Sequence, residues 1–84
     1  MKFYVYILQS EVDASFYIGY SADLSQRIDQ HNSGLSQYTS TKRPWRLVYF
    51  EDFDDKTTAV QRERFLKKMK NRDFILRLIH SLDD

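Results

Sequence analysis

Five side chains in this sequence have the chemistry that phosphodiester hydrolysis requires: Tyr6, Tyr17, Arg27, His31 and Glu63. The reaction needs an activated water, positive charge beside the non-bridging oxygens, and help for the departing oxygen. Arginine suits the second task because its planar guanidinium pairs bidentately with phosphate and stays charged. A divalent cation suits the second and third tasks. One carboxylate, here Glu63, is an adequate anchor for Mg²⁺ when waters and substrate oxygens complete the coordination.

Two kinds of side chain compete for the role of general base. A free tyrosine has a pKa of about 10, so at pH 7 only about one in a thousand is ionised, a deficit of about 4 kcal/mol. The positive charge of Arg27 and of a metal ion would reduce that deficit by stabilising the phenolate. His31 needs no such shift. The residue types leave both assignments open, with the other residue orienting the water or relaying its proton.

A β-hairpin is expected to position the two tyrosines. The segments 3–8 and 16–20 are rich in strand-forming residues, and a polar stretch separates them. Strand alternation places residues 3, 5 and 7 on one face and residues 4, 6 and 8 on the other. A turn centred between Glu11 and Val12 would put Tyr6 directly opposite Tyr17. Gly19 is costly inside a strand and indicates that another group approaches the backbone there.

A helix over about residues 22–32 is expected to supply the next two candidates. Ser21 is a plausible N-cap and Gly34 a suitable terminator. At about 100° per residue, one helix face combines apolar and polar side chains, namely Leu24, Arg27, Ile28 and His31. An amphipathic helix should bury the apolar pair, so a cation and an imidazole on the same stripe indicate that it borders a polar cleft.

The rest of the chain predicts one further strand and two further helices. Residues 32–44 form a long polar loop whose hydroxyls and cations are of the kind that contact sugar and phosphate. The apolar run 46–53 predicts a third strand, expected in the central or most buried position. Two amphipathic helices follow, one from a cap at Asp54, Asp55 or Thr57 to about Lys70 and one over Asp73–Leu82. The order is strand, strand, helix, strand, helix, helix, which is an α+β fold.

Length and composition favour one small domain over residues 1–84, with a formal net charge of +1 and no cysteine. The absence of cysteine excludes disulfides, thiolate metal sites and thiol nucleophiles, and it is compatible with a reducing compartment. No signal sequence or membrane span is apparent, so we expect a cytoplasmic protein without membrane contact. Residues 62–77 hold seven basic side chains against two acidic ones. Such a local basic surface can attract phosphate.

The order and spacing of these residues resemble the GIY-YIG nuclease domain, and most closely its small single-domain YhbQ-like group. The similarity runs through Tyr4-Val5-Tyr6, then ten residues, Tyr17-Ile18-Gly19, Arg27 and His31, and it extends to Lys42-Arg43-Pro44, Leu47-Val48-Tyr49 and Glu63 with Leu66-Lys67. Tyr4 stands where the family's name has glycine, at a position that varies. The resemblance implies a three-stranded antiparallel sheet flanked by three helices, and metal-dependent cleavage of DNA strands.

By position, the resemblance implies a role for each candidate residue. Tyr6 and Tyr17 match the two motif tyrosines, Arg27 the phosphate-binding arginine, and Glu63 the ligand of a divalent metal ion, Mg²⁺ or Mn²⁺. His31 matches a histidine of many relatives. The partner would be DNA, branched or single-stranded forms included, contacted through a separate set of residues: Tyr38, Lys42, Arg43, Lys67 and Lys70. Related nucleases attach separate DNA-targeting domains, so sequence specificity is expected to be poor or supplied by a targeting protein or by DNA shape.

Structural interpretations compete with each functional one. Tyr6 and Tyr17 could form a cross-strand aromatic pair, Arg27 could pair with a surface carboxylate, and His31 could be a histidine at the edge of the core. Glu63 could form an i,i+4 ion pair with Lys67. The acidic segment 51–55 could bind metal, although helix capping explains it more simply. The rival functions are a nucleic-acid-binding module without catalysis, which would use Lys42, Arg43 and the basic helical surface, and a protein-interaction domain.

Overall fold

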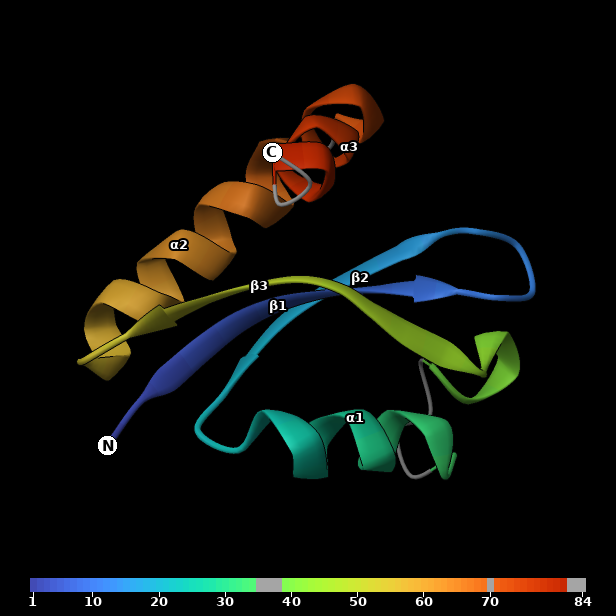
Figure 1. The fold of residues 1–84 in the computed structure, drawn as a ribbon, viewed down its shortest axis with the longest axis horizontal. Helices are drawn as coiled ribbons and strands as arrows, with labels where there is room; N and C mark the ends of the chain where they lie inside the picture. Colours follow the sequence, from blue (N-terminus) through green and yellow to red (C-terminus); the bar gives the residue numbers. More distant parts are fainter. Residues whose placement is uncertain (35–38, 70, 82–84) are drawn as a thin grey trace.

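The computed structural model describes residues 1–34, 39–69 and 71–81. Its elements in chain order are β1 (Phe3–Ser10), β2 (Phe16–Ser21), α1 (Leu24–Asn32), the short 3₁₀ helix η1 (Ser40–Lys42), β3 (Trp45–Phe53), α2 (Lys56–Met69) and α3 (Arg72–His80) (Figure 1). The strands form one antiparallel sheet. The predicted α+β fold, its element order and its antiparallel sheet are therefore confirmed.

The position expected for the third strand was wrong. The strand order is β2-β1-β3, so β1 is central and β3 forms an edge. Residues 5–8 of β1 are all buried, because this strand has a neighbour on each side and a helix layer over each face. The apolar run of β3 has a different cause. Leu47 packs into the cluster on one face of the sheet, and Val48 and Tyr49 pack into a cluster on the other. Packing on both faces favours apolar side chains without deciding which strand lies in the middle.

The hairpin register differs from the expected one by two residues. Tyr6 lies opposite Gly19, and Tyr17 lies opposite Leu8. The turn is centred later because Ser10 is still in β1 and its N–H donates to the Ser15 carbonyl at 2.9 Å. Since side chains alternate with a period of two, a shift of two residues keeps every side chain on its expected face. The two tyrosines therefore remain on one side of the sheet.

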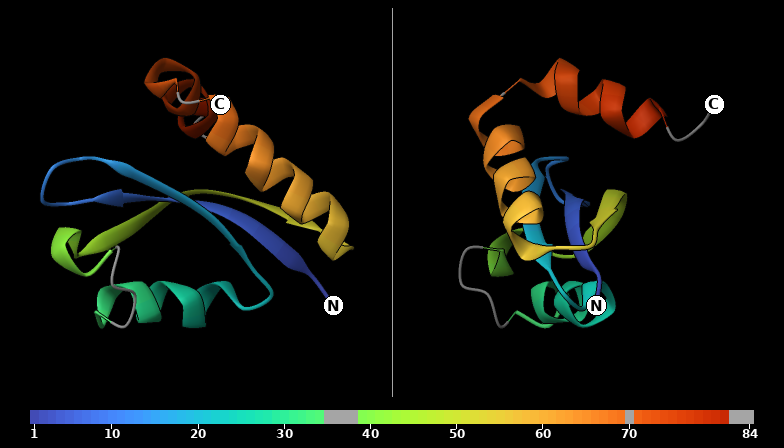
Figure 2. Two further views of the ribbon diagram at one scale, coloured as in Figure 1. Left: turned by 180° about the vertical axis from the view of Figure 1, so that it is seen from behind. Right: turned by 90° about the vertical axis from the view of Figure 1, so that its left-hand side faces the viewer.

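The sheet lies between two helical layers, with α1 on one face and α2 and α3 on the other (Figures 1 and 2). Val5 packs with Ala59 and Leu66 of α2. Ile7 packs with Tyr49 and with Ile75 of α3. On the opposite face, a third cluster combines Tyr6, Leu8 and Trp45 with partly buried side chains that include Leu24 and Ile28 of α1. The predicted alternation along β1 thus divides the core into two halves.

Local capping explains where the helices begin. Asp23, not Ser21, caps α1 by accepting from the Gln26 N–H at 3.0 Å, so the helix begins at Leu24 and not at residue 22. Asp55, one of the three expected caps, accepts from the Thr58 N–H at 2.8 Å. Asn71 caps α3. The expected ends at Lys70 and Leu82 lie outside the described residues. Within the described residues, no helix combines the length and the hydropathy needed to cross a membrane.

Candidate active site

A buried chain of polar side chains links the sheet, α1 and the loop that follows α1. The Tyr6 hydroxyl lies 3.1 Å from His31 Nε2, and His31 Nδ1 lies 3.0 Å from Thr39 Oγ1. His31 is 1% exposed, and Tyr6 and Thr39 are completely buried. Trp45 Nε1 donates to the Thr39 carbonyl at 2.9 Å and holds this loop residue in place. Both ring nitrogens of His31 therefore have a fixed partner.

Thr39 is a member of this chain that the sequence did not reveal. It lies in the polar loop expected to be functional, but the loop also contains Ser33, Ser36, Ser40 and Thr41. No spacing rule singles out one hydroxyl among these, because the loop has no period. Only the folded loop brings Thr39 to the imidazole of His31.

His31 is held neutral by its surroundings. Burial lowers its pKa, and the positive charge of Arg27 lowers it further. A neutral imidazole has one donor and one acceptor nitrogen, and the hydrogen bond at one nitrogen determines the role of the other. If Nδ1–H donates to Thr39, then Nε2 accepts from the Tyr6 hydroxyl. In that tautomer the imidazole is ready to take the phenolic proton.

The Tyr6 hydroxyl is not an easily ionised group by itself. Burial raises its pKa to about 12, against the lowering effect of hydrogen bonding to the Arg27 guanidinium, and the charges of Tyr17 and Glu63 raise it further. Arg27 lies beside both tyrosines, because interactions with Tyr6 and Tyr17 raise the pKa of its guanidinium. Four of the five predicted residues therefore meet on the α1 face of the sheet.

The aromatic rings around His31 complete this arrangement. The Tyr17 ring centroid lies 4.7 Å from that of His31 and 6.4 Å from that of Tyr6. Trp45 packs edge-on against Tyr17 at 6.1 Å. Tyr6 and Tyr17 therefore do not lie directly opposite each other across the strands, as expected. They form a diagonal pair, and His31 lies beside them between α1 and the sheet. Arg27 itself is exposed, so its guanidinium is accessible to a ligand.

Gly19 has the close neighbour that its position in a strand indicated. A Cβ atom at Gly19 would lie 2.5 Å from the Tyr6 hydroxyl oxygen and 2.7 Å from its ring carbon Cζ. Real Cβ atoms essentially never approach so closely. The phenol of Tyr6 therefore rests directly on the backbone of β2, the edge strand on the side of the sheet away from β3.

Glu63 belongs to α2, on the other helical layer, yet its charge acts on Tyr6. Its carboxylate raises the pKa of the Tyr6 hydroxyl. The right-hand view of Figure 2 shows α2 on the β2 side of the sheet, where the Tyr6 phenol rests on Gly19. The Glu63 side chain is 15% exposed and lies 3.6 Å from the Lys67 ammonium. The ion pair with Lys67 is thus present together with the proximity to the tyrosine.

The donor set fits a metal ion held largely by its substrate. Among the described residues there is no group of three or more histidine, aspartate or glutamate side chains suited to bind a metal. Glu63 offers one carboxylate, whose charge acts on the Tyr6 hydroxyl. Mg²⁺ commonly binds through one or two carboxylates while keeping several waters and taking oxygens from a substrate phosphate. Such a site predicts weak metal affinity without nucleic acid.

The residues expected to contact nucleic acid are dispersed. Lys42 Nζ pairs with Asp13 at 3.2 Å, beside the hairpin turn. Arg43 is exposed, and Lys67 is exposed beside Glu63. Tyr38 and Lys70 lie outside the described residues. Of those that are described, Lys42 and Arg43 lie at the end of η1 and just after it, whereas Lys67 lies on α2.

The acidic segment 51–55 serves the structure. Glu51 accepts two hydrogen bonds from the Arg62 guanidinium, each at 2.9 Å, and a third from the Tyr49 hydroxyl. Asp54 pairs with Lys2, and Asp55 caps α2. Arg62, counted with the basic helical surface in the sequence, is therefore engaged by Glu51. The interpretation of this segment as a metal site is not needed.

Known proteins share both the sequence and the fold. Residues 2–75 match the model of the GIY-YIG catalytic domain. The chain is 45% identical over 67 residues to the UPF0213 protein SSP2268 of Staphylococcus saprophyticus, covering 79% of this chain and 80% of that protein. It is 44% identical over 79 residues to UPF0213 protein CPE1444 of Clostridium perfringens, covering 93% and 83%. The solution NMR structure of UPF0213 protein BH0048 from Bacillus halodurans is similar, with a TM-score of 0.57 and 38% identity over 94% of this chain and 83% of that one.

Proposed function

This chain belongs to the GIY-YIG nuclease family, and from that premise we propose that it is a metal-dependent endonuclease that hydrolyses phosphodiester bonds in DNA with low intrinsic sequence specificity. The observation that supports this function best is the buried contact of 3.1 Å between the Tyr6 hydroxyl and His31 Nε2, with the Arg27 guanidinium beside it. A proton acceptor and a phosphate-binding cation thereby face the same phenol.

His31 acts as the base in this proposal, and Tyr6 relays the proton. Ionising a phenol of pKa about 12 at pH 7 costs roughly 7 kcal/mol at 1.36 kcal/mol per pKa unit, so Tyr6 is a poor base alone. If the attacking water gives its proton to the Tyr6 oxygen while the Tyr6 proton moves to His31 Nε2, the phenol stays neutral throughout. The buried imidazole is neutral and can accept that proton.

Arg27 and Glu63 serve the phosphate. The exposed guanidinium of Arg27 pairs with the non-bridging oxygens, where negative charge develops in the transition state. Glu63 would hold the divalent cation, Mg²⁺ or Mn²⁺, which supplies Lewis-acid stabilisation of the phosphate and the leaving oxygen when bound. Tyr17 packs against His31 and limits the directions from which water reaches the base. DNA as partner, poor sequence specificity and the cytoplasmic location are parts of the same proposal.

The test is a nicking assay on supercoiled, branched and single-stranded DNA with Mg²⁺, Mn²⁺ or chelator. We expect Arg27→Ala and Glu63→Gln each to lower the nicking rate by about 100-fold or more, because each removes charge stabilisation specific to the transition state. Arg46→Ala is the matched control for Arg27, since Arg46 is an exposed arginine on β3 outside the basic helical surface, and it should leave the rate within about twofold. Circular dichroism verifies that each variant is folded. Cleavage at the wild-type rate by Arg27→Ala and Glu63→Gln would refute the assignment.

The second candidate function is nucleic-acid binding without catalysis. The 3.6 Å ion pair between Lys67 and Glu63 favours it, because it gives Glu63 a structural partner. This function predicts DNA affinity that falls steeply with salt, survives Glu63→Gln, and yields no cleaved product with any metal ion. The nicking assay and a salt titration of binding on the same samples distinguish the two functions.

A further inference from the structure

The outer edge of β3 has no neighbouring strand among the described elements. The sheet order β2-β1-β3 leaves β3 with one paired and one open side, and α2 lies toward β2 at the opposite edge (Figure 2, right). β3 is also the longest strand, with nine residues. An open strand edge presents backbone donors and acceptors to which another extended segment can bind.

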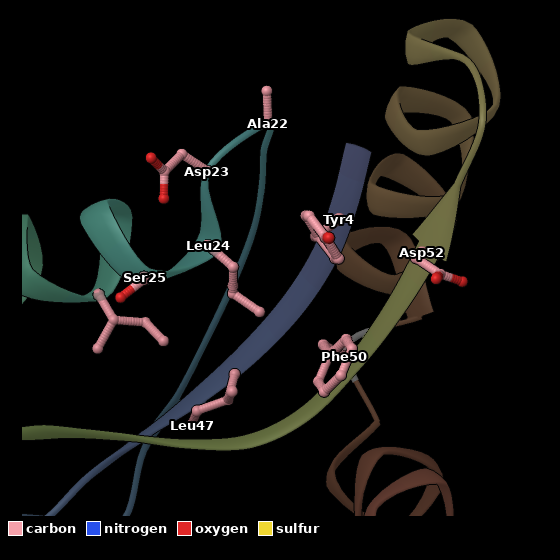
Figure 3. Close-up of a pocket in the computed structure, with 9 residues that line it drawn as sticks. Tyr4, Ala22, Asp23, Leu24, Ser25, Leu47, Phe50 and Asp52 are labelled. Atoms are coloured by element: carbon pink, nitrogen blue, oxygen red, sulfur yellow. The ribbon is translucent and has the colours of Figure 1, made fainter. Parts of the chain in front are cut away.

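A hollow lies beside this edge, between β3 and the start of α1. Its volume is about 630 Å³, and its apolar walls are Tyr4, Leu24, Ile28, Leu47 and Phe50 (Figure 3). Phe50 is 46% exposed although it packs edge-on against Tyr4 with ring centroids 6.1 Å apart. The hollow contains none of the candidate catalytic residues, so the proposed nuclease function does not account for it.

The same residues of β3 line the hollow and direct their backbone groups outward. Successive strand residues point their N–H and C=O alternately to the two sides. Asn32 bonds both backbone groups of Trp45, accepting from its N–H at 2.5 Å and donating to its C=O at 3.0 Å, so these groups face away from β1. Leu47 follows this direction two residues later.

Beyond Leu47, a bulge in the pairing of β3 with β1 determines which residues of β3 point their backbone groups outward. Ile7 pairs with Tyr49 and Leu8 with Leu47, so β3 has one extra residue at Val48. Beyond it, Phe50 and Asp52 therefore point their backbone groups outward, and both line the hollow. A segment that added to β3 would thus place every second side chain over the hollow. Asn32 already makes such a pair of bonds at the Trp45 end.

The charge of the hollow indicates the chemistry of its occupant. Among the described residues, its charged lining consists of Asp23 and Asp52, and the Asp52 carboxylate is directed away from β1 (Figure 3). DNA would bring phosphates to these carboxylates, and a second copy of the chain would bring its own acidic margin. Both are disfavoured by like charge, whereas lysine or arginine side chains would be favoured.

We propose that the outer edge of β3 and the adjoining hollow form a docking site for an extended segment of another protein that carries an apolar and a basic side chain two residues apart, on the same face of the segment. The segment would pair with the backbone of Leu47, Phe50 and Asp52, seat its apolar side chain against Phe50, and place its cation beside Asp52. Such a partner could bring the domain to its substrate, but the docking itself does not depend on nuclease activity.

The test uses a fluorescently labelled heptapeptide, capped at both ends, in which one face alternates valine and lysine and the intervening residues are serine. Its binding to the whole chain is measured by anisotropy. We expect saturable binding that Phe50→Ser weakens by about tenfold or more. Phe65→Ser is the matched control, because Phe65 is also 46% exposed but lies on α2, and it should change affinity by less than about twofold. Asp52→Asn, and the same peptide with glutamate in place of lysine, should each weaken binding. Amide chemical shifts should move at Leu47, Phe50 and Asp52.

Three results would overturn the proposal. They are no saturable binding, equal losses from Phe50→Ser and Phe65→Ser, and self-association of the chain through β3 without peptide. The Arg27→Ala variant distinguishes the docking proposal from the nuclease proposal, because it should bind the peptide with the same affinity as the wild-type protein. Peptide binding by a protein that cleaves no DNA would leave the docking site intact and refute only the nuclease function.

Discussion

Tyr6 and Gly19 fit together at the level of single atoms. The Tyr6 hydroxyl oxygen would be 2.5 Å from a Cβ at Gly19, and the Tyr6 ring is buried on all sides. Gly19→Ala should therefore cost about 1–3 kcal/mol of unfolding free energy, because an added methyl group in a close-packed position forces the ring or the strand to shift. Urea denaturation measures this loss.

A double-mutant cycle attributes that loss to the contact. In a Tyr6→Phe background the oxygen is gone, so Gly19→Ala should cost less than in wild type, with part of the clash remaining at Cζ. An equal cost in both backgrounds would show that the hydroxyl is not what requires glycine at this position.

His31 couples stability to pH. Burial and the charge of Arg27 hold its folded pKa below its ordinary value of 6.5. When pH falls below about 6.5, the unfolded chain binds a proton that the folded chain resists, so the free energy of unfolding should fall; above that pH this contribution is complete. Urea unfolding at a series of pH values between about 5 and 8, on both sides of the ordinary histidine pKa of about 6.5, measures this change in the free energy of unfolding.

The other histidine offers the control for this pH dependence. His80 is exposed on α3. The fall in stability between neutral and mildly acidic pH should shrink in His31→Gln and persist in His80→Gln. The opposite pattern would mean that His31 is not the group responsible.

Among the secondary-structure elements, α1 is hydrogen-bonded to β3 through the side chain of its last residue. Asn32, the last residue of α1, bonds both the N–H and the C=O of Trp45. Asn32→Ala leaves two backbone groups without this partner, so we expect a loss of about 1–3 kcal/mol in stability. Hydrogen exchange should accelerate most at the Trp45 amide.

The nearby Asp29→Ala is a suitable comparison, because Asp29 is exposed on the same helix. It should alter stability by no more than about 0.5 kcal/mol. If Asn32→Ala had an equally small effect, α1 would have to be held in place by its apolar contacts alone.

At the scale of the whole molecule, the two helical layers pack on opposite faces of the same sheet. Leu66 of α2 is buried against Val5 and Ala59, whereas the single tryptophan, Trp45, lies in the cluster on the α1 face. Leu66→Ala should cost about 2–5 kcal/mol, and Trp45 fluorescence should report the full loss, because a domain this small unfolds as one unit.

The exposed Met69, also on α2, provides the control, and Met69→Ala should have little effect on the transition seen by Trp45. A Trp45 transition unchanged by Leu66→Ala would indicate that the α1 layer unfolds separately. In that case Glu63 and the Tyr6–His31 pair would belong to two independently stable parts.

The sequence by itself determined the element order, the two faces of β1 and the faces on which Tyr6, Tyr17, Arg27 and His31 lie, because these follow from local periodicity. Period two in a strand and about 3.6 in a helix assign each side chain to a face without knowledge of the partner. The same reasoning misplaced β3 in the centre of the sheet and predicted a hairpin register that differs from the observed one by two residues. The periodicity of side chains along a strand is the same for any order of the strands and for any register shifted by two residues, so it cannot predict either.

Only the tertiary structure decided the contacts between elements. It brought Thr39 to His31, engaged Arg62 with Glu51, and left the edge of β3 open beside a hollow. It also placed the charge of Glu63 near Tyr6 from the opposite layer. Such contacts join residues that are far apart in the sequence. Burial and hydrogen-bond geometry determine them only when the helical layers have packed against the sheet.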